Sequence, residues 1–237
     1  MLPLRDLNRT STTPYVNRAL LAANIIIFAV YWLSSSNMLL GPGLALDMED
    51  KFVMVPAEII QGQRFFTLFT SMFMHAGWLH LLGNMIFLYV FGDNVEDAFG
   101  HVSYFVFYIF CGLVASLSQI LITLYAPSLN SLFGLQIPSD LTTGVVGASG
   151  AISGALGAYT LLYPRARVLT LVVYVILPIP AIIFLGAWFA LQFVYAFFDL
   201  SGGVAYFAHI GGFIVGVILA ATIGRKRKKM RDRRLKL

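Results

Sequence analysis

The sequence predicts an all-α membrane protein, a bundle of six transmembrane helices with both termini on the cytoplasmic side. Of its 237 residues, 59% are hydrophobic and only 11% are charged, and the mean hydropathy is +0.81. Soluble domains do not have this composition. The apolar residues gather in stretches near the ~20 residues that a helix needs to cross a bilayer. The basic residues flank these stretches unevenly, which indicates an orientation.

Six apolar stretches are predicted to be spans. They cover residues 20–40, 72–91, 102–126, 144–163, 180–198 and 205–224. One further apolar piece, residues 168–177, is too short to cross a bilayer. It is rich in β-branched residues and is closed off by Pro178 and Pro180. We interpret it as an interfacial strand or as a lead-in to the fifth span.

Lysine and arginine set the predicted orientation, because they are retained on the cytoplasmic side near span ends. All but two of the 16 basic residues precede the first stretch, follow the fourth, or lie in the tail. Only Lys51 and Arg64 fall on the other face. The prediction is a single membrane domain over 1–237. Its parts are a cytoplasmic N-terminus at 1–19, an outer-side segment at 41–71 and a basic cytoplasmic tail at 225–237.

The net charge of +5 requires no nucleic-acid partner. We expect the basic tail to anchor the last span and to contact anionic membrane lipids, with binding of DNA or RNA as the weaker alternative. Cys111 is the only cysteine and lies in the third stretch, so no internal disulfide can form, and we interpret it as a core residue. The first stretch is long enough to remain as a span, so no cleavable signal peptide is predicted.

Two polar residues near the starts of different spans suggest a catalytic site. Ser149 lies in Gly-Ala-Ser-Gly at 147–150, and His209 lies in Ala-His-Ile-Gly-Gly at 208–212. A hydroxyl and an imidazole are the minimum set for nucleophilic acyl transfer. Counted from Gly144 at ~1.5 Å per residue, Ser149 is expected roughly 8 Å along its helix, and His209 at a similar shallow depth.

Each of these two residues also has a plainer explanation. A serine among glycines and alanines often serves packing, and a histidine near an interface often forms only a local hydrogen bond. The pair can meet only if the fourth and sixth helices approach closely. Small residues at four-residue spacing permit this. They are Gly150, Gly154 and Gly157 with Ala151, Ala155 and Ala158 on the fourth span, and Gly212 and Gly216 on the sixth.

A third polar group stands at the outer entrance to the second span, where His75 is followed by His80 and Asn84. His80 and Asn84 share a helix face. Together with the Ser149 N–H near a helix N-terminus, they would donate hydrogen bonds to the oxyanion of a tetrahedral intermediate. The plain alternative is that three polar side chains line a wet loop.

These motifs resemble those of the rhomboid family of intramembrane serine proteases, of the basic six-span type. The resemblance covers almost the whole chain, and it includes Gly-Asp-Asn-Val-Glu-Asp at 92–97 and Arg64. It implies that Ser149 is the nucleophile and His209 the general base and later the acid. His80, Asn84 and the Ser149 amide would form the oxyanion hole. Supporting residues would be His75, Gly147 and Gly150.

The resemblance further implies a substrate, a gate and a location. The substrates would be transmembrane segments of proteins, whose helices unwind near the outer interface. The fifth span and the loop at 199–206 would gate their entry. No metal and no cofactor is expected, and the expected location is a prokaryotic plasma (inner) membrane.

Two positions depart from the family pattern. Many members have an aromatic residue four positions after the nucleophile, stacked on the imidazole, where this chain has Ser153. The common Trp-Arg pair of the outer segment is Gln63-Arg64 here, with Trp78 and Phe65 as possible substitutes. No carboxylate accompanies the serine and histidine in the spans, so we predict a dyad rather than a triad.

Two other functions are alternatives for a chain of this kind. A non-catalytic scaffold of the same superfamily would bind transmembrane segments without cutting them. Such proteins lack the serine and histidine, whereas this chain has both. A transporter would call for charges at the membrane midplane or a repeat of discontinuous helices, and the sequence shows neither.

Overall fold

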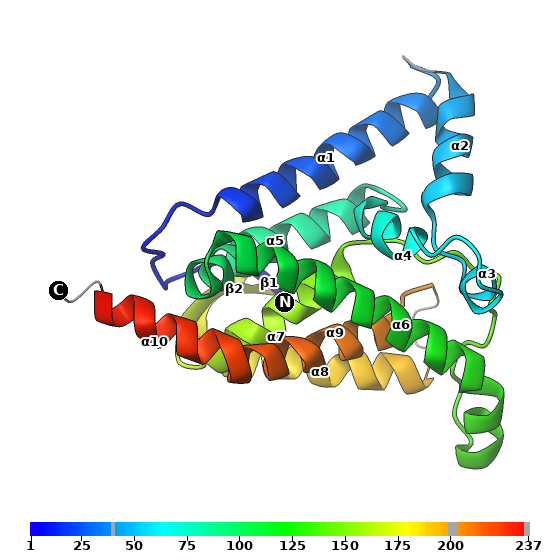
Figure 1. Ribbon diagram of the computed structural model, residues 1–237. Coiled ribbons are helices and arrows are strands. Elements are labelled where there is room, and N and C mark those ends of the chain that lie inside the picture. The colour runs from blue at the N-terminus through cyan, green and yellow to red at the C-terminus, as the bar shows by residue number, and fades with distance from the viewer. Residues whose placement is uncertain (39–40, 199–202, 235–237) are drawn as a thin grey trace.

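The computed structural model describes residues 1–38, 41–198 and 203–234, and it is mostly helical (Figure 1). Short helices occupy the predicted outer segment, and long ones form the bundle. The helices are α1 (Tyr15–Ser35), α2 (Pro42–Phe52), α3 (Pro56–Ile60), α4 (Thr67–Thr70), the 3-10 turn η1 (Ser71–Phe73), α5 (Trp78–Phe99), α6 (His101–Phe133), α7 (Ser149–Leu162), α8 (Ala181–Phe198), α9 (Tyr206–Leu219), the π-helical turn η2 (Ala220–Gly224) and α10 (Arg225–Arg234).

All six predicted stretches contain a helix, but their lengths differ from the prediction. Among the described residues, four helical segments are long and apolar enough to span a membrane: α1, α6, α8 and Tyr206–Asp232. A fifth is possible if Thr67–Phe73 and Trp78–Phe99, which meet at a bend of 93°, form one span. The helix of the fourth predicted stretch, α7, has only 14 residues and is about 21 Å long. It is shorter than the ~30 Å hydrocarbon core.

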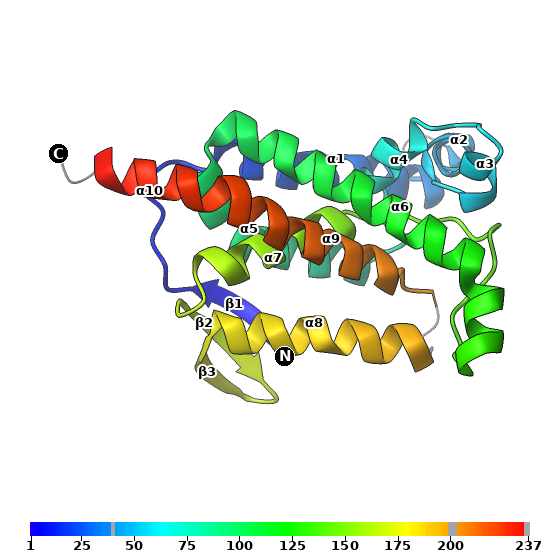
Figure 2. The same ribbon diagram turned by 60° about the horizontal axis from the view of Figure 1, so that its bottom comes forward.

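The short helix α7 lies at the centre of the bundle. It packs against α5, α6, α8 and α9, and both views show it enclosed by them (Figures 1 and 2). Its residues from Gly150 to Tyr159 are all buried, and most are glycine or alanine. Small residues on every face allow four neighbours to approach at once.

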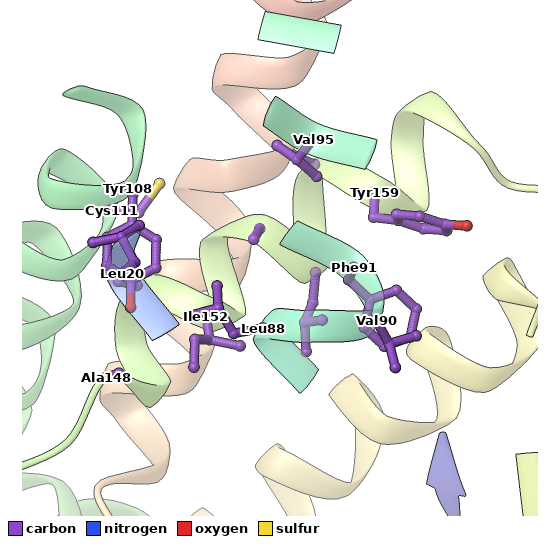
Figure 3. Packing of buried hydrophobic residues seen from close by; sticks show 14 of the residues in the cluster. Leu20, Leu88, Val90, Phe91, Val95, Tyr108, Cys111, Ala148, Ile152 and Tyr159 are labelled. Atoms are coloured by element: carbon purple, nitrogen blue, oxygen red, sulfur yellow. The ribbon is translucent and has the colours of Figure 1, made fainter. Parts of the chain in front are cut away.

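The core is built from apolar side chains of α1, α5, α6 and α7 (Figure 3). Phe91 of α5 meets Tyr159 of α7 edge to face, with ring centroids 5.0 Å apart. Cys111 of α6 is fully buried in the same cluster. Its predicted place in the core is therefore confirmed.

A three-stranded antiparallel sheet covers one end of the bundle. Its strands are β1 (Leu2–Asp6), β2 (Arg167–Val172) and β3 (Val175–Pro180), in the order β1-β2-β3. The strand interpretation of 168–177 is thus confirmed, and this piece forms a hairpin at the start of α8 (Figure 2). Strand β1 was not predicted, because its partner is β2, far along the chain, and its own sequence is too short for a pattern.

Carboxylates at the end of α5 hold the chain ends together. Asp97 accepts hydrogen bonds from Ser11 and Thr12 and pairs with Arg231 of α10. Glu96 accepts two N–H groups from the first turn of α1, where a negative charge is favourable. The N-terminal segment and the basic tail therefore meet at one end of the bundle, which explains the acidic residues of the 92–97 motif.

Candidate active site

Ser149 is the first residue of α7. Residues 144–148 are not helical, so the predicted depth of roughly 8 Å along a helix that begins at Gly144 is wrong. Gly147 has φ +122°, a conformation that only glycine adopts without strain, and it prevents the helix from starting earlier. The Ser149 amide consequently lies at a helix N-terminus, where N–H groups have no partner within the helix.

His209 lies in the first turn of α9 and is buried. Its Nε2 is 2.8 Å from the Oγ of Ser149. The two side chains that the sequence analysis paired thus form a hydrogen bond, although 60 residues separate them in the chain. This is the distance over which a serine hydroxyl can pass its proton to an imidazole.

Glycines explain how α7 and α9 come this close. A Cβ on Gly212 would overlap the carbonyl oxygen of Gly150, and a Cβ on Gly216 would overlap that of Gly154. The predicted close approach of the helices is therefore confirmed, with one correction. A Cβ on Gly154 would first meet Cys111 of α6, at 2.5 Å. Gly154 is therefore tightest against α6, and the glycines of α9 that let it approach α7 are Gly212 and Gly216.

The other ring nitrogen of His209 contacts a residue that the sequence analysis missed. Nδ1 is 2.8 Å from Oε1 of Gln192, and Nε2 of Gln192 is 3.0 Å from the backbone oxygen of Trp188. Both residues lie on α8. The available signal was a single carboxamide in a helix of 18 residues that is otherwise apolar, where a polar side chain is costly.

Ser153 occupies the position at which many family members carry an aromatic residue. Its hydroxyl donates to the carbonyl oxygen of Ser149 at 2.7 Å and does not stack on the histidine. The aromatic neighbours of His209 come from other helices instead. The ring centroids of Trp188 and Tyr206 are 6.0 and 6.1 Å from its own.

The predicted oxyanion residues lie around Gly147. A Cβ there would be 2.7 Å from Nε2 of His80 and 3.6 Å from Nδ2 of Asn84. The Asn84 side chain is 8% exposed, and its Nδ2 has no hydrogen-bond partner among the described residues. His75 is also buried and lies behind His80, with ring centroids 5.1 Å apart.

One cavity of about 760 Å³ joins these groups. Its lining includes His80 and Asn84 as well as Ser149 and His209, whereas His75 does not line it. The loop before α7 contributes the exposed Asp140, whose pKa is lowered to about 2 by hydrogen bonds from Thr142 and Thr143. No group of three His, Cys, Asp or Glu side chains in the described parts of the chain is arranged to hold a metal ion.

An apolar helical bundle with a hydrogen-bonded serine-histidine pair lining a cavity defines a class, that of integral membrane proteins with polar side chains at an internal site. The chain belongs to the rhomboid family, because the model of the Rhomboid domain matches residues 62–226. Every residue proposed for the site falls within this match.

Several curated proteins are similar to this chain. Rhomboid protein 1, mitochondrial, of Saccharomyces cerevisiae is 28% identical over 222 residues, which cover 92% of this chain and 56% of that protein. Rhomboid protease GluP of Bacillus subtilis is 33% identical over 168 residues, 70% of this chain and 27% of that protein. RHOMBOID-like protein 12, mitochondrial, of Arabidopsis thaliana is 28% identical over 175 residues, 73% of this chain and 51% of that protein.

The chain spans about half the length of the yeast protein and of RHOMBOID-like protein 12. These two relatives are named as mitochondrial. The comparisons therefore lend no support to a prokaryotic plasma membrane as the location, whereas the apolar helices and the family support an integral membrane protein.

Proposed function

We propose that the protein is an intramembrane serine endopeptidase that cleaves transmembrane segments near the outer interface. The observation that carries the proposal is the hydrogen bond of 2.8 Å between Ser149 Oγ and His209 Nε2, at a helix N-terminus inside a cavity. Family membership adds support, since one relative is named a rhomboid protease.

The chemistry follows from these atoms. Ser149 Oγ attacks the scissile carbonyl carbon while its proton passes to His209 Nε2. The imidazolium then gives this proton to the leaving amine, and an acyl-enzyme remains on the serine. Water, deprotonated by His209, hydrolyses the ester and restores the hydroxyl.

The oxyanion of each tetrahedral intermediate needs donors that are already in place. Asn84 supports this role, because its buried Nδ2 has no partner in the described chain, and an unpaired buried donor is costly unless a ligand uses it. The Ser149 N–H at the start of α7 and Nε2 of His80 are the other two proposed donors. His75, behind His80, would hold that ring in place.

We propose that substrates enter between α5 and α8. Phe87 of α5 and Trp188 of α8 both line the cavity, and their ring centroids are 6.2 Å apart. Separation of these two rings would open the cavity sideways to lipid. Of the loop expected to help in gating, residues 199–202 lie outside the described residues.

We also propose the six-span arrangement of the basic type, with both termini in the cytoplasm. It is supported by the meeting of the N-terminal segment and α10 at the end of α5. A cysteine introduced at Lys229 should then react with an impermeant maleimide from the cytoplasmic side only. Reaction from the opposite side would overturn this orientation.

A non-catalytic scaffold is the alternative, since several relatives are named only rhomboid-like. The test is reconstitution of the chain in liposomes with a single-span substrate, and mapping of the cut by mass spectrometry. We expect one cut near the outer interface and labelling of Ser149 by a fluorophosphonate. A well-folded chain that neither cuts nor reacts with the probe would favour the scaffold.

Asn84→Ala should reduce kcat by ~10²–10³, the usual effect of losing one oxyanion donor. KM should change little, because the donor acts mainly on the charge that develops in the transition state. Steady-state cleavage in detergent measures both. Leu82→Ala, at an exposed position of the same helix, is the control and should leave both constants unchanged. Full activity in Asn84→Ala would remove this residue from the oxyanion hole.

A further inference from the structure

We propose that Gln192 of α8 is a positioning residue for His209, which it holds in the one tautomer that can accept the proton of Ser149. The proposal rests on the function proposed above. It adds a third group, from a third helix, to a pair that the sequence analysis predicted to act alone.

The orientation of the Gln192 amide follows from its two partners. Its Nε2 is 3.0 Å from the backbone oxygen of Trp188, and a carbonyl oxygen can only accept. The NH₂ group must therefore point there, because it is the only donor of the side chain. Oε1 is left to face Nδ1 of His209, at 2.8 Å.

This orientation fixes the proton on the imidazole. An amide oxygen accepts and never donates, so Nδ1 of His209 must carry the hydrogen. A neutral imidazole has only one N–H, so Nε2 has a free lone pair, and this lone pair faces the Ser149 hydroxyl at 2.8 Å. The opposite tautomer would set two lone pairs against each other at Gln192 and would leave Nε2 unable to take a proton.

Burial makes the contact effective. Gln192 is 5% exposed and His209 is 9% exposed, so water has little access to replace a lost partner. When His209 becomes an imidazolium during the reaction, the negative end of the amide dipole faces its Nδ1–H. A neutral amide does this less well than the carboxylate of a Ser-His-Asp triad.

The contact also links the base to α8, one of the two helices between which we propose that substrates enter. His209 is on α9 and Gln192 on α8, so they stay together only while these helices are packed. The imidazole is therefore held in this orientation only while α8 is packed beside α9.

The test uses two substitutions of similar length. Gln192→Met fills the space but has no acceptor for Nδ1–H, and Gln192→Glu retains an oxygen there. We expect Gln192→Met to lower kcat on the order of 10²-fold with KM within about threefold. This is less than the ~10⁴ lost when the carboxylate of a triad is neutralised. Gln192→Glu should recover kcat to within about tenfold of the wild type.

Leu191→Met is the matched control, because it places the same side chain at an exposed position of α8. It should leave kcat unchanged. The proposal is overturned if Gln192→Met keeps the wild-type kcat. It is overturned equally if Gln192→Glu is no better than Gln192→Met while both melt at the wild-type temperature.

A second measurement needs no activity and no variant at Gln192. Ring ¹⁵N NMR, with the His209 signals assigned by their loss in His209→Ala, should show Nδ1 protonated and Nε2 unprotonated in the wild type. The opposite tautomer would overturn the proposal even if Gln192→Met fails to fold. If the wild type does not cleave, the proposed function fails, and the NMR result still decides the role of Gln192.

Discussion

Ser149→Ala should abolish cleavage of a transmembrane substrate, and His209→Ala should do the same. We expect each to reduce kcat by roughly 10⁴-fold or more, because a nucleophile without its base, or a base without its nucleophile, retains little activity. The double variant should be no worse than either single one, since the two groups act as a unit. Single-turnover cleavage in liposomes measures all three.

Stability separates a chemical effect from a structural one. Ser149→Ala removes one oxygen atom, so its melting temperature in detergent should stay close to that of the wild type. Thr160→Ala is the control on the same helix, because this hydroxyl donates within α7, to the backbone oxygen of Leu156. Cleavage that persists in Ser149→Ala would exclude the serine as the nucleophile.

Gly216→Ala should unfold or strongly destabilise the bundle, although no reacting atom changes. The new methyl group would overlap the backbone of Gly154, since it would lie 2.7 Å from the Gly154 Cα. Backbone atoms cannot rotate away as a side chain can. Overpacking of this kind costs ~1–3 kcal/mol or more. A shift of α9 by about 1 Å would also misplace His209 and could cost ~10²-fold in rate. Thermal melts and turnover measure the two effects.

Gly186→Ala on α8 provides the contrast. Nothing lies within 4 Å of the Cβ that it would add, so stability should be unchanged or slightly raised, by up to ~1 kcal/mol, because alanine favours a helix. Turnover should not change. Equal melting temperatures for Gly216→Ala and the wild type would contradict the tight contact between α7 and α9.

The local pattern of the chain was enough to predict the helices and to select most of the residues of the candidate site. Apolar stretches near ~20 residues predict helices in a membrane. Each of the six stretches contains a helix, and among the described residues four helical segments, or five with the bent pair, are long and apolar enough to span one. Ser149 and His209 stood out because polar groups are costly among apolar ones. The glycines of the two helices indicated their close approach before any distance was known.

Other features of the structure are not indicated by any local pattern in the sequence. The start of α7 depends on the backbone of Gly147, which hydropathy does not report, so the predicted depth of Ser149 was wrong. The pairing of β1 with β2 joins segments more than 150 residues apart. Gln192 belongs to no motif, and its partners are the His209 side chain on α9 and the backbone oxygen of Trp188 on its own helix.

The sequence by itself determined which positions are polar, small or apolar, and so which residues could do chemistry in a membrane. Only the tertiary structure decided which of these groups meet. The reason is physical: a hydrogen bond acts over ~3 Å, a fraction of a helix diameter, so the rotation and approach of packed helices decide whether it forms. Ser149, His209 and Gln192 come from three helices, and their packing places them within that distance.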